Sequence, residues 1–252
     1  MYIQKFKRIL HVQPDGILHV GAHKAEELQE YEANEFYGKG KIYWVEGQTD
    51  LFNELASRLD RETNVVIQAY AWNLNNEEVT FNVTNKTASS SLFNLDQHLI
   101  KYPEIYVKEK IKIYTSRLDA VLPKDAKFDY VALDIQGSEL KALEGLGRLL
   151  DQVKWIYTEV SRERLYENAP LLRDMDDFLF QKGFKRRFTA WDRKANWGDA
   201  LYIHKSIFKN DLITFVRSSF WQFSRFVRSF IPQFMFPLLV KIKHRIKGSI
   251  LK

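Results

Sequence analysis

Three carboxylates in the sequence come directly after apolar runs that are typical of buried strands. Glu46 ends the run KIYWVE, Asp134 ends DYVALD and Glu159 ends KWIYTE. Because parallel strands present their carboxyl ends at one edge of a sheet, we expect these three side chains to meet there. Acids gathered at one edge repel one another unless they are solvated or face a cation or hydroxyl donors. The pattern therefore indicates a ligand site, although each acid alone would also suit a solvated loop or a helix cap.

The turn after the first expected strand indicates what kind of ligand this edge would hold. The segment HVGAHKAEE contains Gly21, which permits a tight turn, and the helix that follows offers free backbone N–H groups. It lacks the G-x-G-x-x-G and P-loop patterns that bind phosphates. Glu46, about 25 residues further on, stands where nucleotide-binding folds carry a ribose-binding carboxylate. Ribose recognition without a diphosphate loop suggests a nucleoside-like cofactor such as S-adenosylmethionine, whose sulfonium suits an acidic pocket.

The elements that would position these acids alternate between strands and helices. Apolar runs predict strands over 16–22, 41–47, 64–72, 78–83, 128–135 and 153–160, and amphipathic periodicity predicts helices over 24–36, 49–60, 138–150 and 171–183. Thr49 is a candidate N-cap of the second helix. Residues 185–191 and 199–204 resemble a closing hairpin that would leave one antiparallel strand at the sheet edge. This order is typical of an α/β fold whose mostly parallel sheet is covered by helices on both faces.

The composition narrows the kinds of chemistry. The chain has 252 residues, of which 45% are hydrophobic and 28% charged, and this suits one α/β domain with an appendage. No cysteine occurs, so disulfides, thiolate zinc sites and cysteine nucleophiles are excluded. The N-terminal segment MYIQKFKRILHVQPDG has no apolar core of the kind found in signal peptides, so we expect a cytoplasmic protein.

Charge is distributed unevenly along the chain. The segment 205–252 holds ten Lys or Arg residues and a single acid, Asp211, whereas the net charge of the whole chain is only +6. The part that precedes it is therefore mildly acidic. This asymmetry predicts a catalytic domain over 1–204 and a basic, aromatic tail over 205–252.

The tail has the pattern of an amphipathic helix. Its apolar residues recur every three or four positions, at Val216, Phe220, Phe223, Val227, Phe230 and Phe234. Its longest uncharged run, 229–240, has 12 residues, fewer than the ~20 that cross a bilayer. A helix lying on an anionic membrane surface at the cytoplasmic face fits this pattern. Packing on the domain, or on a second copy in a homodimer, is the alternative, and nucleic acid is disfavoured because the rest of the chain is net acidic.

Several motifs in a fixed order resemble the FkbM-type methyltransferases, which use S-adenosylmethionine. LDIQGSELKALEG closely resembles the family signature D-x-x-G-x-E-x-x-x-L-x-G, and ILHVGAHKAEE and VEGQTDLFNEL resemble the first cofactor loop and the ribose-acid segment. QAYAWN, ASSSL, TEVSRERLYEN and WGDALYI resemble the remaining blocks. The resemblance spans about residues 15–204 and implies a Rossmann-like class I methyltransferase fold, to which the tail adds a C-terminal helical segment.

Carried over position by position, the resemblance implies two groups of site residues. The cofactor-binding group is His19, Val20, Gly21, Ala22, His23, Glu46, Gly47, Ala71, Trp72, Ser90 and Asp134, with Glu46 on the ribose and Ala71 and Trp72 near the adenine. Ser90 belongs to a serine loop, 89–91, over the cofactor or the acceptor. Asp134, Glu139 and Glu159 would face the acceptor. His19 and His23 replace the aspartate and asparagine that are usual in this family, so the polar contacts of this loop would differ.

The resemblance implies methyl transfer to a hydroxyl, commonly on a sugar of a glycan or glycolipid precursor. Such a reaction is an in-line displacement at the sulfonium methyl, for which the protein supplies positioning and removes the hydroxyl proton. Asp134 is our first choice for the general base. Glu139, Glu159 and His23 are alternatives, His23 because an imidazole has an unperturbed pKa of ~6.5. A divalent cation on Asp134 would also activate a hydroxyl, but no metal-ligand spacing in the sequence requires one.

Two other functions compete with catalysis on a sugar. A degenerate domain could bind the cofactor without turnover and tether a partner through the tail, although the retained acids at 46, 134, 139 and 159 argue against this. A nucleic-acid methyltransferase would use the tail to grip phosphates. The N-P-P-[YF] motif of enzymes that flip a base into their active site is absent from the sequence, which makes this function less favoured.

Overall fold

The computed structural model describes residues 12–33, 40–95, 101–192 and 196–210. Within these ranges the strands are β1 (Ile17–Val20), β2 (Ile42–Glu46), β3 (Asn64–Gln68), β4 (Tyr70–Trp72), β5 (Glu78–Thr84), β6 (Val107–Arg117), β7 (Tyr130–Leu133), β8 (Trp155–Ser161), β9 (Phe184–Trp191) and β10 (Trp197–His204). The helices are α2 (Leu28–Ala33), α3 (Thr49–Arg58), α5 (Leu118–Val121), α6 (Glu139–Gly145) and α7 (Leu172–Gln181). Short 3-10 turns occur at η1 (Thr87–Ser89), η2 (Gly147–Gln152) and η3 (Lys205–Asn210).

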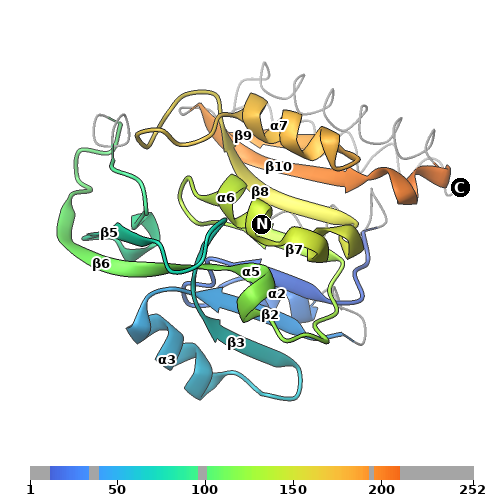
Figure 1. Ribbon diagram of the computed structural model, residues 1–252, viewed down its shortest axis with the longest axis horizontal. Coiled ribbons are helices and arrows are strands. Elements are labelled where there is room, and N and C mark those ends of the chain that lie inside the picture. The colour runs from blue at the N-terminus through green and yellow to red at the C-terminus, as the bar shows by residue number, and fades with distance from the viewer. Residues whose placement is uncertain (1–11, 34–39, 96–100, 193–195, 211–252) are drawn as a thin grey trace, which may run out of the picture.

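A seven-stranded sheet in the order β3-β2-β1-β7-β8-β10-β9 forms the centre of the molecule (Figure 1). The neighbours from β3 to β8 are parallel, whereas β10 runs antiparallel to both β8 and β9. The strand order reverses between β1 and β7, and ligands bind at such a reversal in open α/β sheets. This arrangement confirms the predicted Rossmann-like fold.

The antiparallel strand does not lie at the edge of the sheet, where the sequence pattern placed it. β10 inserts between β8 and β9, and β9 forms the edge. β9 exposes Lys185 and Arg186, and charged side chains suit an edge because they discourage pairing with other chains. The apolar run ALYI of β10 suits the interior. The expected position was wrong because a hairpin pattern does not say which of its two strands joins the sheet.

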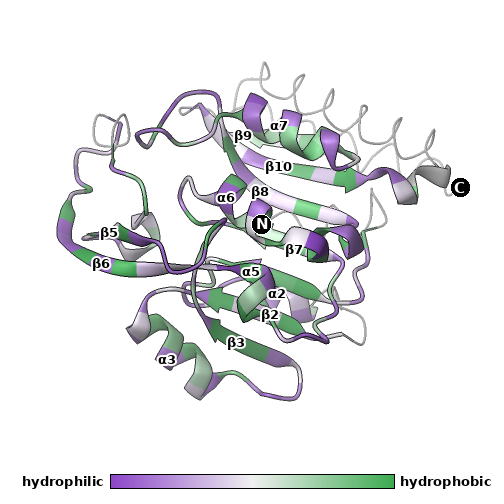
Figure 2. Cartoon of the chain, in the orientation of Figure 1, coloured by the Kyte–Doolittle hydropathy of each residue, from purple (hydrophilic) through white to green (hydrophobic). Residues whose placement is uncertain are grey.

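Side chains alternate between the two faces of the sheet, and each face has its own core. One core joins alternate strand residues, such as Val20, Val45 and Leu133, to α5, α6 and α7. The other joins the intervening residues, such as Ile17 and Trp44, to α2 and α3. Figure 2 shows hydrophobic colour concentrated on the central strands and polar colour along the loops and the outer sides of helices. Burial on both faces explains why these strands are continuous apolar runs in the sequence.

A second, three-stranded sheet in the order β4-β6-β5 lies to one side of the main sheet (Figure 1). The expected strand 64–72 is interrupted at Ala69, so β3 stays in the main sheet while β4 pairs with β6. β6 was not predicted because the lysines in VKEKIKIYT mask the alternation of a strand with one exposed face. This second sheet brings β5 and η1 over the carboxyl ends of the main strands.

The four predicted helices occur in the predicted order but differ at their ends, and the short helix α5 was not predicted. α3 begins after Gln48, which occupies the N-cap position without a side-chain capping bond. Thr49 is therefore not the N-cap, and its hydroxyl accepts a hydrogen bond from Gln68 at 2.9 Å. α7 ends just before Gly183, whose φ of +86° allows the chain to turn into β9, as predicted. The predicted helix over 138–150 divides into α6 and the turn η2.

Most of the expected tail, residues 211–252, lies outside the described residues, and so does the amphipathic stripe that begins at Val216. The described chain continues past β10 only as the short turn η3. None of the described helices is long and apolar enough to cross a membrane. The division of the chain into domains at residue 204 stays a prediction.

Candidate active site

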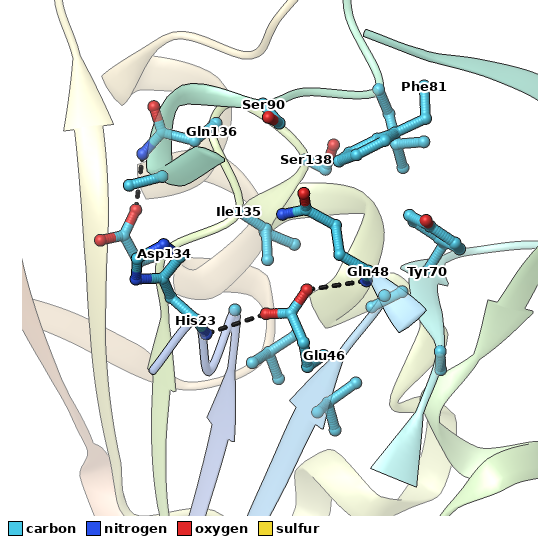
Figure 3. Close-up of a pocket in the computed structure, with 18 of the residues that line it drawn as sticks. His23, Glu46, Gln48, Tyr70, Phe81, Ser90, Asp134, Ile135, Gln136 and Ser138 are labelled. Carbon is cyan, nitrogen blue, oxygen red and sulfur yellow. Dashed lines mark hydrogen bonds between the residues drawn. The ribbon is translucent and has the colours of Figure 1, made fainter. Parts of the chain in front are cut away.

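A cleft opens at the carboxyl ends of β1, β2 and β7 (Figure 3), and its space, together with the adjoining space open to solvent, is about 570 Å³. It lies where the strand order reverses, and β4, β5 and the segment around η1 complete its wall. The expected cofactor-binding residues that line it are Val20, Gly21, His23, Glu46, Gly47, Ala71, Ser90 and Asp134.

Glu46, the last residue of β2, lines the cleft with both carboxylate oxygens engaged. Oε2 accepts a hydrogen bond from the backbone N–H of His23 and Oε1 accepts one from the backbone N–H of Gln48, each at 2.8 Å. The residue is 6% exposed, and burial raises the pKa of its carboxyl, an effect that the two N–H donors oppose. Each oxygen keeps a free lone pair, so Glu46 can still accept hydrogen bonds from a pair of ligand hydroxyls.

The turn after β1 brings two backbones into close contact at the floor of the cleft. Gly21 has a φ of +88°, and a Cβ at this position would lie 1.9 Å from the backbone oxygen of Asp134. The N–H groups of Gly21 and Ala22 both donate to the carbonyl of Val45, at 2.9 and 3.0 Å. Because only glycine fits both the conformation and the space, backbone rather than a side chain forms this part of the floor.

His23 joins the loop after β1 to η1 on the other side of the cleft. Its φ of +44° is uncommon for a residue other than glycine. Nδ1 lies 2.7 Å from Oε1 of Glu26, and Nε2 lies 2.9 Å from the hydroxyl of Thr87. Because both ring nitrogens have partners, His23 is not free to act as a general base in this conformation. Its contacts suit it to hold η1 in place.

The far end of the cleft is apolar and contains a buried hydroxyl. The ring centroids of Tyr70 and Phe81 lie 4.9 Å apart, and Ala71 and Ile135 line the same cleft (Figure 3). Ser138, which also lines it, is 1% exposed, and no described residue is a hydrogen-bond partner of its Oγ. It occupies the N-cap position of α6 without making a side-chain capping bond. A buried hydroxyl without a hydrogen-bond partner destabilises the folded protein, so a polar ligand atom that bonded to Oγ of Ser138 would remove this cost.

A second cavity adjoins the cleft and shares Ala88, Asp134 and Gln136 with it. Its space, including the part open to solvent, is about 1420 Å³. Its aromatic and acidic lining residues are Tyr102, Tyr157, Tyr166, Trp197, Glu27, Glu104, Asp134, Glu159 and Asp199. Of the three acids expected at strand ends, Glu46 ends β2 and Asp134 follows β7, whereas Glu159 lies inside β8, two residues before its end. Glu46 and Asp134 line the cleft, and Asp134 and Glu159 line the second cavity. Within the described ranges, no three His, Asp or Glu residues are grouped so that they could hold a metal ion.

Asp134 stands at the boundary between the two cavities. Its side chain is exposed to them, although protein atoms crowd around it. Burial raises the pKa of its carboxyl, and the 2.7 Å hydrogen bond from Nε2 of Gln136, followed by the nearby His19, opposes that rise. A carboxylate that keeps its charge here can face a cation in the cleft and accept a proton from a hydroxyl in the second cavity.

Glu159 lies opposite Asp199 in the β8–β10 pair, and both line the second cavity. Burial raises the pKa of Glu159 well above its usual value, and the carboxyls of Asp134, Glu139 and Asp199 raise it further. A carboxyl that holds its proton is a poor base and a good hydrogen-bond donor. Glu159 is therefore better suited to bind an acceptor hydroxyl than to take its proton.

Glu139, which was expected to face the acceptor, instead holds the turn that follows β7. Its Oε1 accepts hydrogen bonds from the backbone N–H groups of Ile135 and Gly137, each at 3.1 Å. It is 4% exposed, and burial raises the pKa of its carboxyl to about 7. It lines neither the cleft nor the second cavity, but a smaller pocket of about 390 Å³ that shares Glu159 with the latter. Glu139 is the first residue of α6, and its side chain points back at the turn before the helix, which explains why it does not reach either cavity.

His19 lines the second cavity and not the cleft, where the resemblance placed it. Its ring stacks on Trp44 with the centroids 4.9 Å apart, and its Nδ1 lies 2.9 Å from the hydroxyl of Tyr31. Burial lowers the pKa of His19 to about 4, so the ring is neutral at neutral pH. Alternation along β1 explains the position, because His19 points to the opposite face from its neighbour Val20.

Two further expected cofactor contacts, Ala22 and Trp72, line neither cavity. Ala22 is fully buried in the core beneath α2. The Nε1 of Trp72 donates a hydrogen bond to Glu77 at 2.9 Å, and its ring centroid lies 5.6 Å from that of Phe93. These contacts hold Trp72 away from the cleft, where Tyr70 supplies an aromatic ring instead.

Several lining residues were not anticipated from the sequence, namely Gln48, Tyr70, Phe81, Thr87, Ile135, Gln136 and Ser138. Three of them stand inside the signature DIQGSE, so chain continuity with Asp134 was a usable signal. Phe81 and Thr87 come from β5 and η1, which no local pattern connects with the cleft. Of the expected serine loop, Ser90 lines the cleft and Ser89 lines the second cavity.

Sequence comparison shows which proteins this chain is similar to. The family model of the methyltransferase FkbM domain matches residues 19–186. A relative named 2-O-methyltransferase NoeI, from Sinorhizobium fredii, is 31% identical over 93 residues. That alignment covers 36% of this chain and 38% of the relative.

Structural comparison gives more distant likenesses. The methyltransferase FkbM of Methylobacillus flagellatus has a TM-score of 0.48 and 13% identity, over 75% of this chain and 43% of that chain. A SAM-dependent methyltransferase of Aquifex aeolicus has a TM-score of 0.41 and 13% identity, over 79% of this chain and 88% of that chain. This chain therefore spans less than half of NoeI and of the Methylobacillus protein.

Proposed function

Because the chain belongs to the FkbM methyltransferase family, we propose that it transfers the methyl group of S-adenosylmethionine to a hydroxyl oxygen of a sugar. One observation carries this proposal: Asp134 lines both the cleft and the second cavity. A donor in the cleft and an acceptor in the cavity would then meet beside one carboxylate. Each cavity would then hold one of the two substrates, and Asp134 is the charged residue among the three that line both cavities.

The residues of the cleft suit each part of this cofactor. Glu46 can accept hydrogen bonds from the two ribose hydroxyls, since each of its oxygens has a lone pair left. The apolar end, with Tyr70 and Phe81, can bury the adenine, and the Oγ of Ser138 can pair with a polar atom of the base. The Asp134 carboxylate can face the positively charged sulfur. S-adenosylmethionine would supply an electrophilic methyl group when bound.

The transfer needs only positioning and one proton acceptor from the protein. The acceptor oxygen forms a bond to the methyl carbon while the carbon–sulfur bond breaks, so the positive charge on sulfur is lost. The hydroxyl proton passes to the carboxylate of Asp134, which becomes a neutral carboxylic acid, and charge is conserved. Asp134 is the first choice because Glu159 favours its protonated form and His23 has partners on both ring nitrogens.

A sugar acceptor is supported by the walls of the second cavity. Its partly exposed aromatic rings, Tyr102 and Trp197, offer flat apolar surfaces, and its acids offer partners for hydroxyl groups. The relative named 2-O-methyltransferase supports oxygen as the atom that is methylated. The acceptor we propose is a glycan or a glycolipid precursor, and the basic tail would bring the enzyme to an anionic membrane at the cytoplasmic face.

Two measurements test this function. Calorimetry should show binding of S-adenosylmethionine and of S-adenosylhomocysteine to the full chain, and binding of neither at millimolar concentration would overturn the proposal. The enzyme is then incubated with methyl-labelled S-adenosylmethionine and a glycan and glycolipid extract from its own source. Label should appear on a sugar hydroxyl, and the Asp134→Asn variant should bind the cofactor but transfer little label. Label found only on protein or nucleic acid would contradict a sugar acceptor.

A further inference from the structure

Gln136 forms a bridge between Asp134 and a buried tyrosine. Its amide Nε2 donates a hydrogen bond to Oδ1 of Asp134 at 2.7 Å. Its amide oxygen Oε1 accepts a hydrogen bond from the hydroxyl of Tyr166 at 2.5 Å. Figure 3 shows Gln136 above Asp134 with its amide nitrogen directed at the carboxylate. The two ends of one amide thus connect Tyr166 to the carboxylate that both cavities share.

The backbone around Gln136 holds the bridge in place. Gln136 has a φ of +54°, which is uncommon for a residue with a side chain, and Gly137 after it has a φ of +102°. The backbone oxygen of Gln136 accepts a hydrogen bond from the hydroxyl of Ser91 at 2.6 Å, and Glu139 holds the turn through the N–H of Gly137. Tyr166 is 2% exposed and packs in a small core with Leu165. Such strain is stored where the surroundings fix a functional conformation.

We propose that Gln136 is a positioning residue that keeps Asp134 ionised and aimed between the two cavities, with Tyr166 holding the Gln136 amide in the required orientation. This inference rests on the proposed function. The amide N–H stabilises the charged carboxylate, and the tyrosine hydroxyl polarises the same amide and prevents it from turning away. Hydrogen bonds to a charged acceptor are stronger than neutral ones, and linked bonds strengthen one another.

Titratable groups on several neighbouring elements interact with Asp134. They are His19 on β1, His23 and Glu27 after it, Glu139 on α6, Glu159 on β8 and Tyr166 in the loop after β8. Burial and the nearby Glu27 raise the pKa of Asp134, and the hydrogen bond from Gln136 is the largest influence in the other direction. Removing that bond should therefore raise the pKa of Asp134, so the carboxylate would take up a proton at a higher pH.

A binding experiment can detect the protonation of Asp134 even though the methyl acceptor is not identified. S-adenosylmethionine and S-adenosylhomocysteine differ by the methyl group and by the positive charge on sulfur. An ionised Asp134 should favour the charged compound, and a protonated Asp134 should not. The ratio of their dissociation constants, measured by calorimetry between pH 4 and 8, therefore reports the ionisation of Asp134. The part of the pH dependence that Asp134→Asn abolishes belongs to this carboxyl.

The test variant is Gln136→Met, which nearly preserves the shape of the side chain and removes both hydrogen bonds. The preference for S-adenosylmethionine should be lost at a pH about one unit higher than in the wild type. Tyr166→Phe keeps the buried ring and should shift the pH in the same direction by less. The double variant should shift no further than Gln136→Met, because Tyr166 acts through Gln136. Gln181→Met, on the exposed side of α7, is the matched control.

The outcomes separate this inference from the proposed function. If neither compound binds the wild type, the proposed function fails and the inference fails with it. If both bind and the pH at which the preference is lost is the same in Gln136→Met, Gln136 has only a structural role and the inference is overturned. Because Gln136 has a positive φ, Gln136→Asn is a second variant: asparagine tolerates this conformation but is one methylene shorter. It should shift the pH as Gln136→Met does, and an unshifted profile in both variants refutes the bridge.

Discussion

The Nε2 of His23 and the hydroxyl of Thr87 lie 2.9 Å apart, although 64 residues separate them in the chain. This contact connects the loop after β1 to η1, and both segments line the cleft. The same His23 donates its backbone N–H to Glu46. One residue therefore links the segment over the cleft with the carboxylate that we assign to the ribose.

Thr87→Val should weaken the binding of S-adenosylmethionine. The substitution keeps the shape of the side chain but removes the hydroxyl that holds η1 to His23, and a neutral hydrogen bond contributes about 0.5–1.5 kcal/mol, or about two- to tenfold in affinity. Calorimetry gives the affinity, and stopped-flow fluorescence should show that the loss is in the dissociation rate. Thr80→Val, on the exposed part of β5, is the control. Equal affinity in the two variants would show that η1 is held by other contacts.

Glu46→Gln should weaken the binding of both S-adenosylmethionine and S-adenosylhomocysteine. The amide NH₂ of glutamine would face a backbone N–H donor in place of a carboxylate oxygen, and hydrogen bonds to a charged group contribute about 1.5–3 kcal/mol, or about ten- to a hundredfold in affinity. The losses should be similar for the two compounds, because the ribose is common to both. Glu54→Gln, an exposed change on α3, should leave both affinities unaltered. A loss confined to the charged compound would assign Glu46 to the sulfur instead.

Ser138→Ala should stabilise the free protein while weakening cofactor binding. The free protein would no longer bury a hydroxyl without a described partner, and this should add about 1 kcal/mol to the free energy of unfolding. The bound cofactor would lose a hydrogen bond, so its affinity should fall by about two- to tenfold. Urea unfolding and calorimetry measure the two quantities on the same preparation. A variant that is more stable yet binds equally well would remove Ser138 from the cofactor site.

Glu139→Gln should change how stability depends on pH. Burial raises the pKa of Glu139 to about 7, whereas an unfolded chain has the ordinary value of a glutamate. The folded form therefore binds a proton that the unfolded form has lost, and the contribution of this residue to stability falls as the pH rises from about 4.5 to 7. The loss should be on the order of 2 kcal/mol, and the glutamine variant should lack it. Urea unfolding at pH 5 and pH 8 measures the difference.

The matched control for that prediction is Glu62→Gln, an exposed glutamate whose removal should leave the pH dependence as in the wild type. Other buried acids, including Glu46 and Glu159, change stability in the same direction, so the test is the difference between variant and wild type. If the glutamine variant loses as much stability between pH 5 and 8 as the wild type, Glu139 is ionised in the folded protein.

Local features of the fold were predictable because they depend on neighbours in the chain. The runs before Glu46 and Asp134 are apolar at every position, and Thr158 is the one polar residue in the run 155–158 before Glu159, so all three indicate strands buried on both faces. α7 ends at Gln181, two residues before Gly183, and a glycine just after an amphipathic stretch is a reliable end signal. Strand β6 was not predicted, because one of its faces is exposed and rich in lysine, so its sequence is not a continuous apolar run.

Sequence alone determined the strands of the main sheet, most of its helices, the turn at Gly21 and the carboxylates of Glu46 and Asp134 at strand ends, because each follows from side-chain periodicity or from the backbone freedom of a single residue. Tertiary structure decided which strand of the hairpin joins the sheet, which residues of the second sheet reach the cleft, and how the acids divide between two cavities. It also turned Glu139 toward the backbone and Trp72 away from the cleft. These choices depend on contacts between segments far apart in the chain, and no pattern within one segment records them.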